Sequence, residues 1–219
     1  MIFPGYFPAA NNWQNNSNKK ILLLSENYLH KTPMGVPFMF DISEERIGFN
    51  DLVIDPDGVI RRNLLYAETN EGLFTSFGLR IALHYLKQYH IEPESDATYP
   101  EQLNLGKAAI RPLTSSSGNY HNTDASGYQI LLNYRSQEIA RQVTLTDILT
   151  DRVDPAWITQ KIVIIGTTAS SIKDGFITPY SFGNTQEFHT PGVFFTPKWR
   201  VNSSVLPWEI PQPLKHTHF

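Results

Sequence analysis

The sequence is most informative at first for what it lacks. It contains no cysteine, which excludes disulfides, thiolate metal sites and thiol nucleophiles. It has no apolar run long enough to span a membrane, because its longest runs, Ile21–Leu24 and Ile162–Ile165, have only the length of a strand. A surplus of one charge is also missing, since 18 Lys and Arg stand against 21 Asp and Glu, for a net charge of −3. Nucleic acid is therefore not expected as a partner.

Size and composition indicate a globular protein. The chain has 219 residues, of which 41% are hydrophobic and 18% charged, enough for one domain with a sizeable core. Residues 1–18 are rich in Asn and Pro and are expected to form an irregular segment. The start, Met1–Ala10, has no basic n-region and so does not predict a signal peptide.

A β-hairpin is predicted over residues 47–66. Two strand-like runs, Ile47–Ile54 and Val59–Tyr66, are joined by Asp55-Pro56-Asp57-Gly58. Pro56 favours a type I turn, Asp55 is expected to cap it, and Gly58 suits the left-handed position that follows.

Other segments of the chain predict both helices and strands. Amphipathic spacing indicates a helix over residues 74–89, and Thr144 is expected to cap a short helix with Asp147 three residues on. Strands are expected at residues 21–24, 103–113, 128–134 and 161–166, with the first and last buried on both faces. The predicted fold class is α/β, a mixed sheet flanked by helices.

The strongest candidate ligand loop follows the strand predicted at residues 161–166. Open α/β sheets place ligand loops after such strands, and Gly166, Thr167 and Thr168 offer backbone amides and hydroxyls. Asp174 is positioned to face this loop, with Pro179 downstream. The alternatives are a plain strand exit for the loop and a turn cap for Asp174. The loop lacks both the P-loop and the dinucleotide-binding patterns.

Arg61 and Arg62 follow the predicted hairpin turn and are further ligand candidates, suited to an anion. The simpler alternative is a pair of solvated salt bridges with Asp55 and Asp57. Because side chains alternate along a strand, we expect the two arginines on opposite faces, so that at most one points at a given site.

No catalytic or metal constellation is apparent in the sequence. The seven histidines are scattered, without a pair at helical spacing, and no nucleophile elbow is present. We therefore expect no cofactor, no metal and no enzyme activity. A small hydrolase using residues 166–174 is the alternative.

Seven motifs follow one another along the chain: Gly48–Phe49, Asp55–Arg62, Asp124–Arg135, Lys161–Thr168, Asp174, Thr178–Pro179 and Pro191–Phe194. As an ordered set they resemble the type-two CHASE domain, the second class of cyclase- and histidine-kinase-associated extracellular sensing domains, in its cyanobacterial form. The resemblance covers roughly residues 20–195.

The resemblance implies an extracytoplasmic, periplasmic input module of a membrane receptor that binds an unknown small-molecule ligand. Relatives connect this module through transmembrane helices to a histidine kinase, Ser/Thr kinase or nucleotide cyclase. Within the family-like pattern, the residues expected to shape the fold are Asp55, Asp57, Gly58, Tyr128, Tyr134 and Pro179.

Both ends of the chain depart from the family pattern. The strand–helix–strand section that opens family members is absent, and after Phe195 the expected His-Ala continuation is replaced. Deleting one base from a coding string for such a continuation yields the sequence of residues 196–203. The hypothesis is a partial sensor domain at residues 19–195 followed by an out-of-frame tail at 196–219. A non-functional fragment is the remaining alternative.

Overall fold

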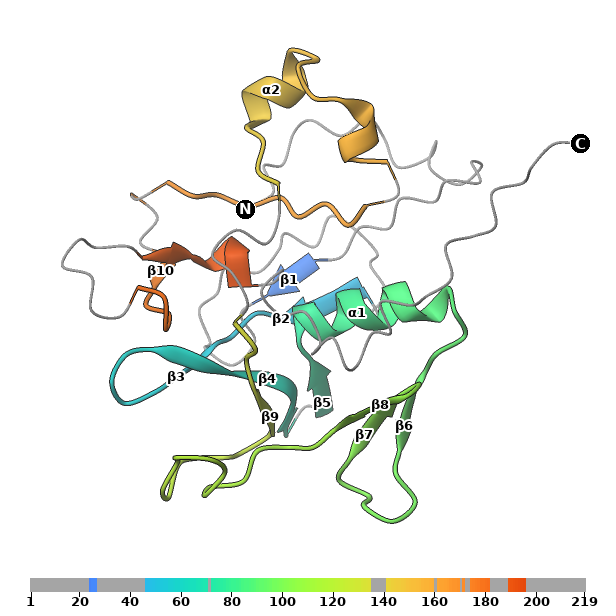
Figure 1. The fold of residues 1–219 in the computed structure, drawn as a ribbon, viewed down its shortest axis with the longest axis vertical. Coiled ribbons are helices and arrows are strands. Elements are labelled where there is room, and N and C mark those ends of the chain that lie inside the picture. Colours follow the sequence, from blue (N-terminus) through green and yellow to red (C-terminus); the bar gives the residue numbers. More distant parts are fainter. Residues whose placement is uncertain are drawn as a thin grey trace, which may run out of the picture. The chain divides into compact units, whose positions relative to one another are not determined.

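A computed structural model describes residues 24–26, 46–70, 72–134, 141–159, 161–169, 171, 174–181 and 189–195 (Figure 1). The chain divides into two compact units. Unit 1 comprises Met1–Ile21 with Tyr134–Lys198, and unit 2 comprises Leu22–Asn133 with Trp199–Phe219. Strands and helices both occur, which confirms the α/β fold class. The expected irregular segment at residues 1–18 and the expected tail at 196–219 lie outside the described residues.

Unit 2 contains most of the strands. Its elements are β1 (Leu24–Glu26), β2 (Ile47–Phe49), β3 (Val53–Ile54), β4 (Ile60–Thr69), β5 (Gly72–Thr75), α1 (Phe77–Lys87), β6 (Pro93–Ser95), β7 (Leu103–Leu105), β8 (Ala108–Ile110) and β9 (Tyr128–Leu131). β4 pairs antiparallel with β3, β5 and β9, whereas β1 and β2 form a separate parallel pair. β6, β7 and β8 make a third, antiparallel sheet. The strand predicted at residues 21–24 begins at Leu24 in the structure. The prediction that it is buried on both faces falls on side chains that lie outside the described part of the structure.

The predicted hairpin is confirmed at its turn but is shorter than predicted. The Gly58 amide donates to the Asp55 carbonyl at 2.8 Å, and Gly58 has a left-handed φ of 82°. The side-chain cap comes from Asp57 rather than Asp55, because the Asp57 carboxylate accepts the Val59 amide at 3.2 Å. Only Val53–Ile54 pairs with β4; Ile47–Phe49 pairs with β1 instead. The first predicted arm is therefore two strands.

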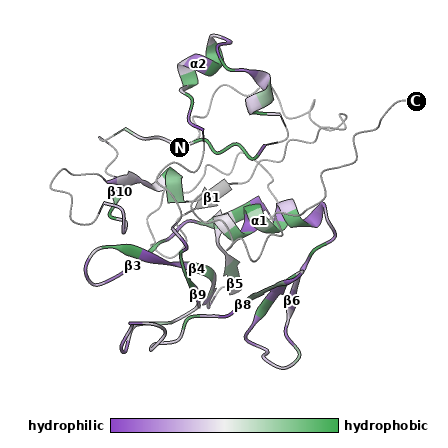
Figure 2. Cartoon of the chain, in the orientation of Figure 1, coloured by the Kyte–Doolittle hydropathy of each residue, from purple (hydrophilic) through white to green (hydrophobic). Residues whose placement is uncertain are grey.

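Helix α1 confirms the amphipathic pattern, with shifted ends. The sequence expectation began at Phe74, but Gly72–Thr75 is held as β5 by pairing with β4. Ser76 caps the helix, its Oγ accepting the Leu79 amide at 3.4 Å. Figure 2 shows hydrophobic and hydrophilic residues alternating along α1. The buried face of α1 joins the main core cluster, which contains Leu65, Leu79, Leu86, Leu103, Leu105 and Ala108.

The single strand expected at residues 103–113 is instead a hairpin. β7 and β8 pair through Leu103 opposite Ile110 and Leu105 opposite Ala108. The chain reverses at Gly106, whose φ of 62° is left-handed and suits glycine. The expected strand at 128–134 is confirmed as β9, which pairs with β4 and continues through the hydrogen bond from the Leu132 amide to the Arg61 carbonyl.

Unit 1 is built from short elements: α2 (Leu145–Leu149), the 3-10 turns η3 (Pro155–Trp157) and η5 (Gly192–Phe194), and the antiparallel pair β10 (Gly175–Phe176) and β11 (Thr190–Pro191). The expected cap at Thr144 is confirmed as a reciprocal capping box with Asp147. The ring of Phe176, the last residue of β10, packs edge-on against the ring of Phe195, with centroids 5.5 Å apart.

The prediction of a buried strand at residues 161–166 is wrong. This segment is extended but lies in no sheet, and Ile162 and Ile165 are 57% and 74% exposed. An apolar, β-branched run favours a strand, but a strand needs a partner, and among the described residues none pairs with this segment.

Candidate functional site

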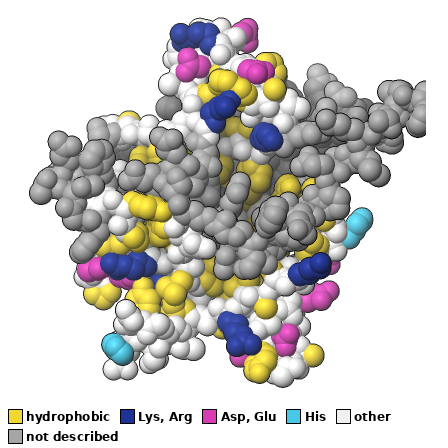
Figure 3. Space-filling view, viewed as in Figure 1, with side chains coloured by type: hydrophobic (Ala, Val, Ile, Leu, Met, Phe, Trp, Pro, Cys, Tyr) yellow, Lys and Arg dark blue, Asp and Glu magenta, His cyan; other side chains and the backbone are white. Residues whose placement is uncertain are grey.

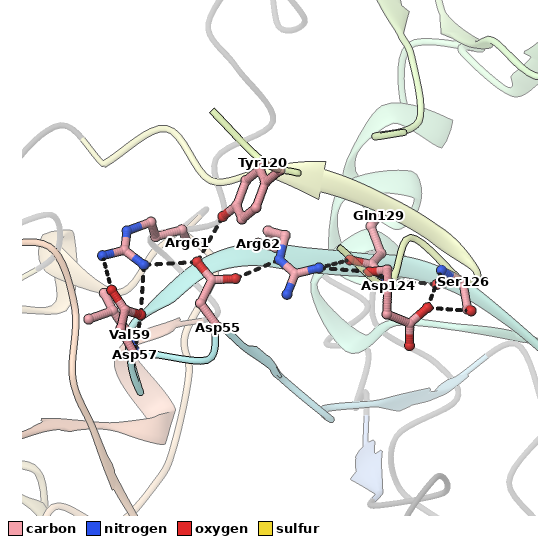
Figure 4. A network of polar contacts seen from close by, with 9 residues as sticks. All are labelled: Asp55, Asp57, Val59, Arg61, Arg62, Tyr120, Asp124, Ser126 and Gln129. Atoms are coloured by element: carbon pink, nitrogen blue, oxygen red, sulfur yellow. Dashed lines mark hydrogen bonds and ion pairs between the residues drawn. The ribbon is translucent and has the colours of Figure 1, made fainter. Parts of the chain in front are cut away.

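Among the described residues, the most connected group of polar side chains lies at the base of the β3–β4 turn and is centred on Asp55 (Figure 4). Its carboxylate accepts three hydrogen bonds. Arg61 donates to Oδ2 at 2.9 Å and Arg62 to Oδ1 at 2.7 Å, while the Tyr120 hydroxyl donates to Oδ2 at 2.7 Å. The Asp55 side chain is only 3% exposed, so this carboxylate is a buried charge held by two cations and a phenol.

Arg62 connects this carboxylate to strand β9, which pairs with β4, and to the segment before β9. Its side chain is 4% exposed, and its Nη1 donates to the Asp124 carbonyl and to Gln129 Oε1, each at 2.8 Å. Its guanidinium also stacks over the Tyr120 ring, 5.1 Å from the ring centroid. Arg62 therefore joins the turn, strand β9 and the segment before β9 through one buried side chain.

Arg61 occupies the outer side of the same turn. Its guanidinium bridges Asp55 and Asp57, with Nη1 2.9 Å and Nη2 2.7 Å from the two Asp57 oxygens. Its side chain is 35% exposed, unlike that of Arg62. Solvent therefore reaches Arg61, and a solute could meet its guanidinium without unfolding the turn.

The ionisation of the network follows from these contacts. Burial raises the pKa of Asp55, but the hydrogen bonds from Arg61, Tyr120 and Arg62 outweigh burial and leave that pKa below its usual value. The hydrogen bonds from Arg61 lower the pKa of Asp57 to about 2. Burial and the hydrogen bond to Asp55 raise the pKa of Tyr120 to about 12. At neutral pH the carboxylates are charged and the phenol is protonated.

The expectation that at most one of Arg61 and Arg62 points at a given site is wrong, since both side chains contact Asp55. Alternation fixes only where each side chain leaves the strand. The register shifts between Val53 and Ile54, and Asp55 presents its two oxygens from the turn to one arginine each. The predicted solvated pairing holds for Arg61 with Asp57, whereas the Arg62–Asp55 pair is buried.

Sequence reasoning missed Tyr120 and Gln129 as members of this network. Tyr120 lies 65 positions from Asp55 in a loop without a recognisable pattern. Gln129 did leave a signal, because it is a polar residue amid apolar neighbours in a predicted strand. A buried polar side chain needs partners, and Gln129 Nε2 also donates to the Asp124 and Ser126 carbonyls.

Tyr128, expected to shape the fold, contacts residues of three other strands, β7, β8 and β4. Its hydroxyl accepts the Leu103 amide at 2.9 Å and donates to the Ile110 carbonyl at 2.8 Å. Its ring packs edge-on against Tyr66, with centroids 6.0 Å apart. Tyr128 thereby links β9 to the β7–β8 hairpin.

The remaining candidates, Gly166, Thr167, Thr168 and Asp174, lie in unit 1. Gly166 packs so closely on Val193 that a Cβ at position 166 would overlap Val193 Cγ2. Thr167 Oγ1 accepts the Ala169 amide at 3.3 Å, and Thr168 is exposed. The loop thus exposes the Thr168 hydroxyl. Packing on Val193 explains why position 166 is a glycine, without a role in ligand binding.

Asp174 lies against the start of η5. Its carbonyl accepts the Gly192 amide at 3.0 Å, and a Cβ on Gly192 would stand 2.5 Å from Asp174 Oδ2. Partial burial raises the pKa of Asp174, and the Gly192 amide offsets this only in part. Pro179 lies in the turn closed by the Ser181 amide and the Thr178 carbonyl, beside Tyr180, whose ring packs edge-on against Tyr134.

Within the described residues, no group of three or more His, Asp or Glu side chains is arranged to hold a metal ion. No helix in the same part of the chain combines the length and apolar character needed to cross a membrane.

Comparison with known proteins gives one match. The family model of the CHASE2 domain matches residues 10–198. No curated protein and no solved structure matches the chain. The match spans both units and contains every candidate residue described above.

Proposed function

The chain belongs to the CHASE2 domain family, and we propose that it is the extracytoplasmic, ligand-binding input domain of a membrane signal-transduction receptor. CHASE2 domains are sensory domains found in signalling receptors. The observation that carries the proposal is the family match over residues 10–198. The proposed output partner is a histidine kinase, a Ser/Thr kinase or a nucleotide cyclase, and the proposed source is cyanobacterial.

A sensory role differs from an enzymatic one in what it demands of the site. A sensor needs a ligand whose affinity differs between two conformations of the domain, and it needs no convergent nucleophile, acid and base. We therefore propose that the chain binds its ligand without turning it over.

The proposed ligand contacts are Arg61 in unit 2 and Thr167, Thr168 and Asp174 in unit 1, each unit being considered by itself. Arg61 is favoured over Arg62 because its guanidinium is partly exposed, whereas Arg62 is buried among protein acceptors. Gly166 is proposed to position the loop through its packing on Val193. A ligand at Arg61 would carry a carboxylate or phosphate that displaces Asp57 from the guanidinium, which binds such groups in a bidentate manner.

Thermal unfolding of the purified chain against a panel of small anionic metabolites tests this proposal. A ligand present at about 100 times its Kd stabilises the folded state by about 2.7 kcal/mol, which raises Tm by about 5–10 °C for a chain of this size. We expect at least one compound to produce such a shift. The exposed Thr168→Val and the control Thr98→Val, in unit 2, separate loss of binding from loss of stability.

Three results bear on the alternatives. A flat melt without a transition would favour the non-functional fragment. A cooperative melt that no compound shifts would contradict ligand binding. Consumption of a stabilising compound during incubation would favour the hydrolase alternative over the sensor.

A further inference from the structure

The sequence contains two Asp-Gly steps, Asp57-Gly58 in unit 2 and Asp174-Gly175 in unit 1. Such a step can rearrange by itself, because glycine has no side chain to hinder the attack of its amide nitrogen on the preceding carboxyl carbon. The reaction needs two groups, the aspartate carboxyl and the glycine amide. The fold holds these two groups differently at the two sites.

At Asp57-Gly58 both reacting groups are engaged. The Asp57 carboxylate accepts two hydrogen bonds from Arg61, at 2.9 and 2.7 Å, and one from the Val59 amide at 3.2 Å. The Gly58 amide donates to the Asp55 carbonyl at 2.8 Å within the turn. Figure 3 shows acidic and basic side chains side by side over the β3–β4 turn. These contacts must break before the amide can attack, so the fold protects this step.

At Asp174-Gly175 the carboxyl group has no comparable hold. None of the ion pairs among the described residues involves Asp174. Its carboxyl group instead packs against the backbone of Gly192, where an added Cβ would stand 2.5 Å from Asp174 Oδ2. Partial burial in this place raises the pKa of Asp174. A raised pKa increases the share of the neutral acid, which is the form that an amide nitrogen attacks.

The Gly175 amide is left out of the ladder between β10 and β11. Gly175 lies opposite Pro191, and the Gly192 amide donates to the Asp174 carbonyl at 3.0 Å. In an antiparallel pair, a bond in this place puts Gly175 and Pro191 at a non-hydrogen-bonded position, so the ladder does not use the Gly175 amide. Because β10 is only two residues long, little pairing must loosen before the nitrogen reaches the carboxyl carbon.

Both glycines have structural reasons of their own. A Cβ at Gly175 would stand 2.6 Å from His189 Cβ, closer than real Cβ atoms approach, so packing requires glycine there. Gly58 has open space around it but a left-handed φ of 82°, which favours glycine. The fold thus needs both Asp-Gly steps in this form, but it engages the reacting groups only at Asp57-Gly58.

We propose that Asp174-Gly175 is a site of spontaneous isomerisation, at which the folded chain converts Asp174 to isoaspartate. The Gly175 nitrogen bonds to Asp174 Cγ, and the carboxyl hydroxyl leaves with the amide proton as water, which closes a five-membered succinimide ring. Water then adds back. Cleavage between the nitrogen and Cγ restores aspartate, whereas cleavage between the nitrogen and the main-chain carbonyl carbon leaves isoaspartate. The steps are redox-neutral and consume no net water.

The product differs from aspartate in backbone length and in the position of its charge. The main chain gains one methylene, and the carboxylate sits directly on Cα. The contact of the carboxyl group with Gly192 and the bond from the Gly192 amide to the Asp174 carbonyl would both be lost. Because Asp174 is also a proposed ligand contact, isomerisation would remove that contact, but the reaction itself does not depend on a ligand.

Peptide mapping of the purified chain, incubated for weeks at neutral pH and physiological temperature, tests the proposal. Electron-transfer fragmentation identifies isoaspartate, because it breaks the Cα–Cβ bond that isoaspartate places in the main chain. In the folded chain we expect isoaspartate to accumulate several-fold faster at Asp174 than at Asp57, the internal control. In guanidinium chloride the two rates should be similar. Equal rates in the folded chain, a faster rate at Asp57, or the same ratio after unfolding overturns the proposal.

Two variants test the assigned chemistry. Asp174→Glu should abolish isomerisation at this position, because the longer side chain would have to close a six-membered ring; persistent isomerisation there would overturn the mechanism. Arg61→Met releases the Asp57 carboxylate and should raise the rate at Asp57 several-fold while the rate at Asp174 stays unchanged. An unchanged rate at Asp57, or an equal rise at both positions, would overturn the protective role of the Arg61 contacts.

Discussion

At the scale of single residues, Arg61 and Arg62 are adjacent in the sequence but differ in environment. Both bind Asp55, yet Arg62 is buried and Arg61 is partly exposed. Removing one partner of a buried ion pair leaves an uncompensated charge in the interior, whereas a solvent-screened pair contributes little. The two arginines should therefore differ in what they contribute to stability.

Arg62→Met should lower the free energy of unfolding by about 3–5 kcal/mol, because Asp55, Gln129 and the Asp124 carbonyl lose a shared buried donor. Arg61→Met should lower it by about 1 kcal/mol or less. Urea denaturation followed by circular dichroism measures both. Similar losses in the two variants would show that burial does not distinguish these arginines.

The same carboxylates predict the response to acid. The folded-state pKa of Asp57 is about 2, and that of Asp55 is also lowered, so both bind protons more readily when the chain is unfolded. Their contribution to stability is complete above their ordinary pKa of about 3.9 and is lost as pH falls toward 2.

Asp57→Asn should therefore make the fall in the free energy of unfolding between about pH 4 and pH 2 less steep than in the unaltered chain. Urea titrations at several pH values in this range provide the measurement. An unchanged slope would mean that the Asp57–Arg61 contact does not persist in solution.

At the scale of elements, the sequence predicted those features that are stabilised by contacts between residues close together in the chain. The Asp55–Gly58 turn, the Thr144 capping box and strand β9 were predictable, because each depends on residues a few positions apart. The convergence on Asp55 was not predictable, since Tyr120 comes from 65 positions away. The prediction of a buried strand at residues 161–166 was wrong, because an apolar run favours a strand but does not specify the neighbour with which it would pair.

Gly166 provides an element-scale test, since it lets the segment before the candidate loop approach η5. Gly166→Ala should destabilise unit 1 by about 1–3 kcal/mol, because its Cβ would overlap Val193. Adding Val193→Gly, which removes the Val193 Cβ as well as its methyl groups, should recover part of this loss relative to Val193→Gly alone.

The control for this pair is Gly58→Ala in unit 2. No atom lies within 4 Å of a Cβ at Gly58, so the cost there comes only from its positive φ. Denaturation of the single and double variants separates the two causes. Recovery of Gly58→Ala by Val193→Gly, or no recovery of Gly166→Ala by it, would contradict the assigned packing.

At the scale of the whole molecule, the family match and the structure address different questions. The match over residues 10–198 establishes a sensory domain family, and the described residues show a well-connected polar network in unit 2 and an exposed apolar stretch in unit 1. The network contributes to holding a turn and two strands together.

Ligand binding itself can be measured without knowing the ligand in advance. The purified chain is equilibrated with a small-molecule extract and ultrafiltered, and whatever it retains is released by denaturation and identified by mass spectrometry. The proposed sensory function predicts one compound class retained near one molecule per chain, and none by chain denatured beforehand. Retention of no compound above the level of the denatured chain would contradict it.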